Sequence, residues 1–265
     1  MSLLFNLILQ ELKNTYIQSI DFDPVHVLTK KNQEQLPVDY FQFYHAVSSV
    51  YSSKLEGEAI DFDSYYKYKF LKVNYQADYT KRSDDLYRAY EFIQHNTLNF
   101  ENTCKAHAHL TAHLLPATQR GKLRNMPMFV INEADRIEYV ACDPYRVKTE
   151  ILSLFAAIET LKQQPLSIFE QFFFAALIHL VFVKIHPFQD GNGRTARLLE
   201  KWFLLESMGK EATAIELEKS YFLNRTAYYH NIRAIGLEYD TLDYAKALPF
   251  LMMTIQSLNT PTPST

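Results

Sequence analysis

The segment that most constrains the fold is an apolar stretch that begins near Ser167 and ends before Pro187. Ser167 and the glutamate three residues later have the spacing of a capping box, which starts helices. Apolar residues then follow on nearly every side, as in a helix buried in a protein core. Pro187 disfavours helical geometry at the preceding residue, so the helix should end around Ile185. The apolar run itself, residues 172–183, contains His179 and is shorter than a membrane span. We expect a buried central helix and no membrane segment.

Other segments also indicate helices. A further helix is expected from about Gly193 to Met208, with Gly209 just past its end. The chain has only six glycines against 18 tyrosines and 19 phenylalanines, which disfavours tight-turned, glycine-rich β folds. One more segment places its apolar residues on a single helical face: Ile151, Leu154, Phe155, Ile158 and Leu161. The sequence therefore predicts an all-α, mainly helical protein.

Only one stretch has β character, and it comprises two short apolar runs around a polar turn. The first run is Met128, Phe129, Val130 and Ile131; the second starts at Ile137. We expect a small β-hairpin in an otherwise helical protein.

The chain shows no internal linker and no repeat, so the first hundred residues are expected to pack on the core as helices. We divide it into an N-terminal helical region, residues 1–95, and a core, residues 96–255. The tail, residues 256–265, contains two prolines and is expected to be disordered.

Charge and cysteine content limit the class of partner and the compartment. A net charge of −3 supplies no basic field for nucleic-acid binding. Two cysteines, Cys104 and Cys142, cannot form a disulfide framework and suit a reducing compartment. The first ten residues lack the features of a secretory leader and are expected to form an amphipathic helix. We expect a cytoplasmic protein that binds neither nucleic acid nor membrane.

The segment that carries chemistry runs from His186 to Arg197 and reads HPFQDGNGRTAR. Glycines allow close approach of backbone to a ligand, and a loop that opens a helix points free amides at an anion. Arg194 and Arg197 lie one turn apart on the expected helix and can both reach the outer oxygens of a polyphosphate. The segment therefore predicts a phosphate site.

Two further residues of the segment suggest which reaction the site catalyses. Asp190 offers the hard oxygen that Mg²⁺ takes beside phosphate oxygens. His186 has an ordinary pKa near neutrality, which suits a general base. Together they indicate phosphoryl or nucleotidyl transfer.

This spacing, H-x-F-x-D-G-N-G-R-x-x-R, resembles the signature of the Fic (Fido) family. The resemblance implies the mainly helical Fic fold and a protein adenylyltransferase, in which a target hydroxyl attacks the α-phosphate of ATP. It implies that His186 accepts the hydroxyl proton and that Asp190 binds Mg²⁺. The nucleotide-binding positions that it implies in the loop and helix are Phe188, Gly191, Asn192, Gly193, Arg194 and Arg197, with Phe188 anchoring the loop in the core.

Two features outside the loop also resemble Fic proteins. Gly121-x-x-Arg124 precedes the expected hairpin, as before the Fic flap, which would make residues 128–131 a target-docking strand. A hairpin with a purely structural role is the alternative. Tyr228 and Tyr229 resemble a tyrosine pair near the adenine pocket.

Upstream, Ser52, Glu56 and Gly57 match the inhibitory motif of the same family. The resemblance implies that Glu56 pairs with Arg197 and thereby excludes ATP or holds it unproductively. The switch would then lie on an N-terminal helix.

Three histidines, His107, His109 and His113, allow a zinc alternative, because histidines four apart share a helix face. No cysteine or carboxylate completes a set, so we favour core or surface histidines.

The leading hypothesis is an autoinhibited enzyme that transfers AMP to a serine, threonine or tyrosine hydroxyl of a target protein, or of the chain itself. Alternatives are removal of AMP, transfer of another phosphate-containing group, and a non-catalytic module that senses nucleotide or binds the target. A homodimer is also possible, since Fic proteins often dimerise.

Overall fold

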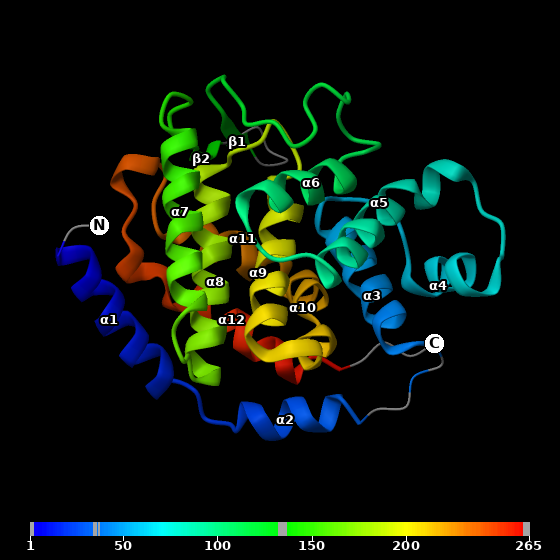
Figure 1. The fold of residues 1–265 in the computed structure, drawn as a ribbon, viewed down its shortest axis with the longest axis horizontal. Coiled ribbons are helices and arrows are strands. Elements are labelled where there is room, and N and C mark those ends of the chain that lie inside the picture. Colours follow the sequence, from blue (N-terminus) through cyan, green and yellow to red (C-terminus); the bar gives the residue numbers. More distant parts are fainter. Residues whose placement is uncertain (1–2, 34–35, 37, 132–136, 262–265) are drawn as a thin grey trace.

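In the computed structural model, the described part of the chain is residues 3–33, 36, 38–131 and 137–261. This part contains twelve α-helices and one two-stranded sheet (Figure 1). The prediction of a mainly helical fold with a small hairpin is confirmed.

The centre of the fold is the helix α8 (Ile168–Ile185), which packs against α7 (Val147–Lys162), α9 (Asn192–Met208) and α12 (Leu248–Gln256) (Figure 1). It begins with the expected capping box, in which Ser167 and Glu170 bond each other's backbone. By length and composition alone α8 could cross a membrane, contrary to the expectation from the shorter apolar run, but 61% of it is buried inside the fold. That burial accounts for its apolar surface.

The remaining helices surround this centre. The helices α1 (Leu3–Gln18) and α2 (Pro24–Lys31) run along one edge, beside α8, α12 and the C-terminal turns (Figure 1). The others are α4 (Phe62–Leu71), α5 (Ala77–Gln94), α6 (Phe100–Leu110), α10 (Leu217–Leu223) and α11 (Arg225–Ala234), with 3₁₀ turns at Gly209–Ala214, Tyr239–Thr241, Tyr244–Ala247 and Ser257–Asn259.

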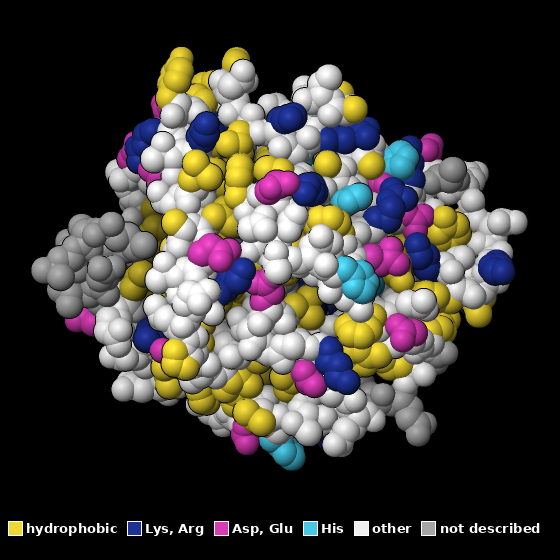
Figure 2. Space-filling view, in the orientation of Figure 1, with side chains coloured by type: hydrophobic (Ala, Val, Ile, Leu, Met, Phe, Trp, Pro, Cys, Tyr) yellow, Lys and Arg dark blue, Asp and Glu magenta, His cyan; other side chains and the backbone are white. Residues whose placement is uncertain are grey.

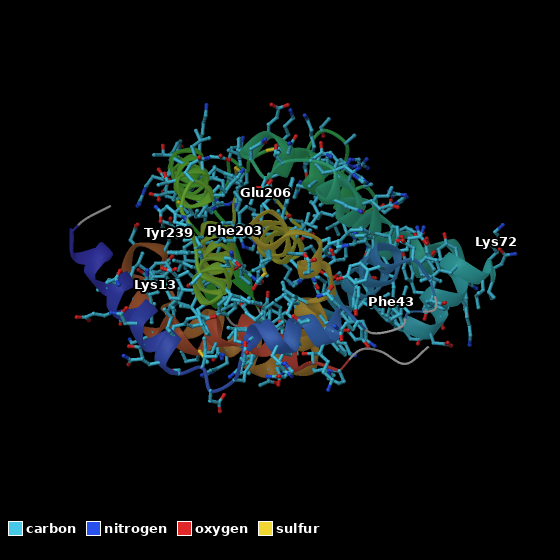
Figure 3. All side chains as sticks on the ribbon, turned by 60° about the horizontal axis from the view of Figure 1, so that its bottom comes forward. Lys13, Phe43, Lys72, Phe203, Glu206 and Tyr239 are labelled. Atoms are coloured by element: carbon cyan, nitrogen blue, oxygen red, sulfur yellow. The ribbon has the colours of Figure 1, made fainter. Side chains whose placement is uncertain are left out.

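The helix α3 (Tyr40–Leu55) connects a second, aromatic cluster to this centre. It packs against α4 and α5 on one side and against α10 on the other. Figure 3 shows Phe43 of α3 in this second cluster and Phe203 of α9 in the main core. The helix α3 also contacts α9 directly.

The hairpin consists of β1 (Phe129–Ile131) and β2 (Ile137–Val140), paired antiparallel with Val130 opposite Tyr139. The turn between the strands lies outside the described residues. Val140 N–H also donates to Leu237 O at 2.7 Å, which ties the hairpin to the helical body.

The expectation of a disordered tail does not hold for residues 256–261. Ser257–Asn259 forms a buried 3₁₀ turn, and Lys31 Nζ donates to Thr260 O at 2.5 Å. Two lysines from distant helices thus bind tail carbonyls, since Lys219 donates to Pro261 O. Residues 262–265 lie outside the described part.

The face seen in Figure 2 carries Lys and Arg interspersed with Asp and Glu. No field of a single sign covers that face.

Candidate active site

The loop between α8 and α9 is built on two left-handed residues. His186 ends α8 with φ of 53°, and Gly191 begins α9 with φ of 77°. A Cβ on Gly191 would approach the Thr111 side chain to 2.7 Å, so both the conformation and the space demand glycine there. These residues turn the chain so that the N-terminus of α9 faces the loop.

Asn192 closes the loop on itself. Its Oδ1 accepts from Phe188 N–H at 2.9 Å, and its Nδ2 donates to Phe188 O at 2.8 Å. The Asn192 amide group therefore shapes the loop, Asn192 can also offer a phosphate its backbone N–H, and its implied role in holding phosphates stays a prediction. Phe188 is fully buried, as expected for an anchor.

His107 supports the loop from α6. Its Nδ1 accepts from Gly121 N–H at 2.8 Å, so its Nε2 carries the proton and donates to Asp190 O at 2.9 Å. Its ring stacks on Phe188 with centroids 3.8 Å apart. Burial lowers the pKa of His107 to about 4, so the ring is neutral. His107 is a structural histidine that holds the loop in place.

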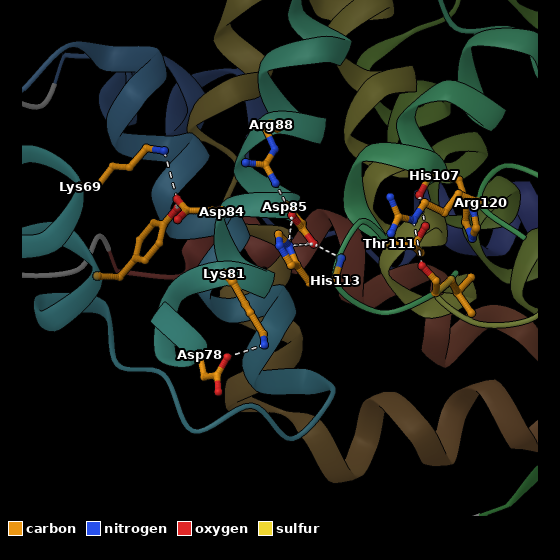
Figure 4. A network of polar contacts seen from close by, with 12 residues as sticks. Lys69, Asp78, Lys81, Asp84, Asp85, Arg88, His107, Thr111, His113 and Arg120 are labelled. Atoms are coloured by element: carbon orange, nitrogen blue, oxygen red, sulfur yellow. Dashed lines mark hydrogen bonds and ion pairs between the residues drawn. The ribbon is translucent and has the colours of Figure 1, made fainter. Parts of the chain in front are cut away.

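The other histidines of the zinc alternative point elsewhere. His113 Nδ1 lies 2.9 Å from Asp85, as Figure 4 shows. Among the described residues, no three side chains of histidine, cysteine, aspartate or glutamate are grouped to hold a metal.

His186 is held in one tautomer by two neighbours. Tyr139 donates its hydroxyl to Val183 O at 3.0 Å, so this oxygen can accept from His186 Nδ1, 3.0 Å away. Nδ1 also lies 3.2 Å from Val183 O. The proton therefore sits on Nδ1, which leaves the lone pair on Nε2. Burial lowers the pKa of His186 to about 4, so the ring is an unprotonated base at neutral pH.

Arg124 fixes the backbone around His186. Its Nε donates to His186 O at 2.6 Å, and its terminal nitrogens donate to carbonyls of Met126 and Ile185 at 2.7 and 3.2 Å and to Cys142 O. One guanidinium thus ties the segment before the hairpin to the end of α8.

Asp190 lies on the exposed side of the loop. Its Oδ1 accepts from Gly191 N–H at 2.6 Å, which holds the carboxylate beside the start of α9. A single exposed carboxylate at an anion site fits Mg²⁺, which is usually held by one carboxylate, waters and phosphate oxygens.

The N-terminus of α9 meets the end of α3. Glu56 Oε1 lies 2.6 Å from an Arg197 terminal nitrogen. A Cβ built on Gly193 would come within 2.8 Å of the same oxygen, so the carboxylate lies directly against the first turn of α9. An anion is favoured at a helix N-terminus, and here Glu56 supplies it.

The end of α3 is shaped to present Glu56. Gly57 adopts φ of 87°, and the backbone bonds from Gly57 to Lys54 and from Glu58 to Ser53 form a Schellman motif. Ser52 also binds Arg197, whose Nε donates to Ser52 Oγ at 3.0 Å. Ser52 and Glu56 thus both bind the Arg197 guanidinium, while Gly57 shapes the end of the helix.

The charge of Glu56 is stabilised despite its environment. Its side chain is 27% exposed. Burial by itself raises the pKa of Glu56, but the charges of Arg197 and Arg194 and the hydrogen bond from Arg197 lower it overall. The carboxylate is therefore ionised at neutral pH.

Arg194 differs from Arg197 in its surroundings. Arg194 is 6% exposed, and its guanidinium donates no hydrogen bond to another of the described residues. Its donors remain available to a ligand beside Glu56.

The two tyrosines differ in exposure. Tyr228 is 1% exposed and accepts from Arg197 at 3.3 Å, and its implied place near adenine stays a prediction. Tyr229 is partly exposed, and its hydroxyl donates to Leu55 O at 2.8 Å, at the end of α3.

The hairpin residues lie near the loop through Tyr139 and Arg124. Phe129 is 53% exposed, while Met128 and Val130 are half-buried. The side chain of Ile131 lies outside the described part. Sequence reasoning did not identify Tyr139, because strand alternation gives the face of a residue and not its partner.

Comparison with known proteins shows which family part of the chain is similar to. Residues 97–204 match the Fic/DOC family. Sixty residues are 42% identical to the protein adenylyltransferase Fic of Drosophila virilis and of Drosophila melanogaster. That stretch is 23% of this chain and 11% of each of those relatives.

Solved structures support the fold alone, because their identities are low. A Fic family protein from Desulfovibrio desulfuricans superposes with a TM-score of 0.67 at 17% identity, covering 94% of this chain and 70% of that one. A Fic domain containing signaling protein from Bacteroides thetaiotaomicron gives 0.63 at 18% identity, covering 95% and 94%. Fic-1 from C. elegans gives 0.63 at 15% identity, covering 97% and 72%. Residues 97–204 of this chain thus match the Fic/DOC family, and the described chain has the fold of Fic proteins.

Proposed function

We propose that this chain is an autoinhibited protein adenylyltransferase that transfers AMP from ATP to a hydroxyl side chain of a target protein and releases pyrophosphate. The observation that carries the proposal is the Glu56 carboxylate on Arg197, at the N-terminus of α9. A phosphate would bind the same donors, next to a histidine whose Nε2 is free to accept a proton.

The reaction uses groups that the loop already orients. His186 Nε2 takes the proton from the target hydroxyl as its oxygen attacks the α-phosphorus. The bond from this phosphorus to the bridging oxygen of the β-phosphate breaks, and pyrophosphate leaves. The amides at the start of α9 and the Arg194 guanidinium bind the phosphates during this step.

Asp190 would hold Mg²⁺ beside these phosphates. A Mg²⁺ ion held there would supply positive charge to offset that of the leaving pyrophosphate. The Asp190 carboxylate is kept on the loop by Gly191 N–H, which leaves the rest of the group facing outward.

The target would dock on the hairpin. Strand addition along β1 would place a target side chain near His186, because Tyr139 of the paired strand contacts that histidine. The exposed ring of Phe129 offers an apolar contact to the incoming segment.

Inhibition follows from competition for one guanidinium. Arg197 can pair with Glu56 or with a terminal phosphate, and two anions sharing it in a partly dehydrated site repel each other. Glu56 therefore keeps the site silent until α3 moves or its carboxylate leaves.

The test compares Glu56→Gly with the parent protein, using Mg·ATP and a cell lysate as the source of targets. We expect labelling of the chain itself or of lysate proteins to rise by at least about tenfold, since the competing anion is gone. ATP labelled at the α-phosphate must transfer the label, and ATP labelled at the γ-phosphate must not. The second variant, Glu58→Gly, removes a neighbouring carboxylate that pairs with Arg82 instead, and should stay silent.

Two further measurements distinguish the alternatives. Adding His186→Ala to Glu56→Gly should abolish labelling while Mg·ATP still raises the melting temperature. Nucleotide binding without any label transfer would point to a sensor module, and transfer of the γ-label would point to phosphoryl transfer. Equal labelling of the parent and Glu56→Gly would contradict autoinhibition.

A further inference from the structure

A line of buried polar side chains connects Arg197 to a second carboxylate, on the side away from Glu56. It passes from Arg197 through Tyr228 on α11 and His179 on α8 to Glu200 on α9. The separations along it are 3.3, 3.0 and 2.6 Å. All four residues are essentially inaccessible to solvent.

The hydrogen bonds in this line all run in one direction. Arg197 can only donate, so the Tyr228 oxygen accepts and its own proton is free to point at His179 Nε2. His179 then carries its proton on Nδ1 and donates it to Glu200 Oε2. The line is therefore a chain of donors that starts at a cation and ends at a carboxylate, and such chains strengthen each bond cooperatively.

The carboxylate at the end is itself fixed. Glu200 Oε1 accepts from Tyr221 at 2.6 Å and from Thr254 at 2.7 Å. Helices α8 to α12 thus each contribute one side chain or more to the arrangement. Tyr228 does not act as a nucleophile here, because it is buried and its hydroxyl is bonded on both sides.

We propose that Tyr228, His179 and Glu200 are positioning residues that hold the Arg197 guanidinium in place and give it a second anion when Glu56 leaves. One part of this inference rests on the proposed function: that a phosphate of ATP binds Arg197 after Glu56 leaves. A fully buried guanidinium without an anion is costly, so the arginine would otherwise lose its position when the switch opens.

The first test needs no nucleotide. Tyr228→Phe and Glu56→Gln are combined in a double-mutant cycle of melting temperature. We expect Tyr228→Phe to lower the melting temperature about twice as much with Gln at 56 as in the parent, because Glu200 is then the remaining anion. The matched control is Tyr221→Phe, which removes an equally buried hydroxyl from Glu200 outside the line and should be additive with Glu56→Gln.

The second test determines which nitrogen of His179 carries the proton in the parent protein, and so the direction of the hydrogen bonds. Nitrogen NMR of His179 should show a neutral ring with the proton on Nδ1. If Tyr228→Phe does not fold, His179→Gln takes its place in the cycle. Additivity of Tyr228→Phe with Glu56→Gln, or a proton on Nε2 of His179, would overturn the inference.

The third test connects the line to the phosphate site, in the Glu56→Gly background. Tyr228→Phe should weaken binding of Mg·ATP about tenfold and leave AMP binding unchanged, since Arg197 faces the terminal phosphates. A merely structural role would weaken both nucleotides equally, and that result would overturn the inference. If Glu56→Gly binds no Mg·ATP, the proposed function fails, while the cycle and the NMR result still decide the role of the line.

Discussion

The hydroxyl of Tyr139 lies 3.0 Å from Nδ1 of His186 and donates to Val183 O. A strand of the hairpin therefore fixes the tautomer of the histidine that ends α8. A displaced hairpin would remove the Tyr139 contact from His186 Nδ1 and leave Val183 O as its neighbour.

Tyr139→Phe should therefore slow transfer without affecting nucleotide binding. Val183 O remains to hold Nδ1, so in the Glu56→Gly background we expect kcat to fall roughly tenfold, about 1.4 kcal/mol, with an unchanged KM for Mg·ATP. Steady-state kinetics measure this split. Tyr145→Phe, at a solvent-exposed position beyond the hairpin, is the control. A rise in KM that matches the loss in kcat/KM would show that Tyr139 acts on binding instead.

Asp190→Asn tests the metal role with little change of shape. The amide can still accept from Gly191 N–H, and the backbone carbonyl that His107 binds is untouched. We expect transfer in the Glu56→Gly background to fall at least about a hundredfold, with partial recovery at high Mg²⁺, because one anionic ligand is lost. If the Glu56→Gly protein with Asp190 unchanged still transfers label in excess chelator, Asp190 does not act by binding Mg²⁺.

Gly193→Ala should have opposite effects in two backgrounds. In the parent, the new Cβ would meet Glu56 Oε1 at 2.8 Å and force the carboxylate off the helix, at a cost of about 1 kcal/mol of unfolding free energy. In Glu56→Gly that oxygen is absent, the nearest remaining neighbour of the Cβ is the mobile end of Arg197, Nη1 at 3.2 Å, and alanine is about 0.5–1 kcal/mol better than glycine within a helix. Chemical denaturation of the parent, Gly193→Ala, Glu56→Gly and the double variant measures the change in unfolding free energy in each background. The same sign in both backgrounds would show that Glu56 does not rest on Gly193.

The sequence predicts this site well where the chemistry is local. The spacing from His186 to Arg197 places base, glycines and arginines on one loop and one helix, because neighbours in sequence are neighbours there. The pairing of Glu56 with Arg197, 141 residues apart, was expected only through the resemblance to Fic proteins.

Other parts of the site depend on packing that no local pattern encodes. His107 and Asp190 are 83 residues apart, and Tyr139 and His186 are 47 apart. Such contacts follow from how helices and the hairpin meet, and a lone histidine or tyrosine gives no signal of its partner. The bonds of the Asn192 side chain to Phe188 were not foreseen for the same reason, since a motif marks a position without showing which atoms its side chain binds.

The pair of Glu56 and Arg197 should weaken in acid. The folded-state pKa of Glu56 lies below its ordinary value of 4.5. A group with a lowered folded-state pKa contributes stability above its ordinary pKa and loses it as pH falls through the folded value. Buried histidines such as His186, whose pKa is lowered to about 4, destabilise the fold in acid in both proteins, and the Glu56 charge is the smallest of the influences on the pKa of His186. We therefore expect Glu56→Gln to be less stable than the parent by on the order of 1 kcal/mol at pH 7, and this difference to shrink below about pH 4.5. Urea denaturation of both proteins between pH 7 and the lowest pH at which they fold measures it. A difference that stays constant throughout would mean that the charge of Glu56 does not stabilise its contact with Arg197.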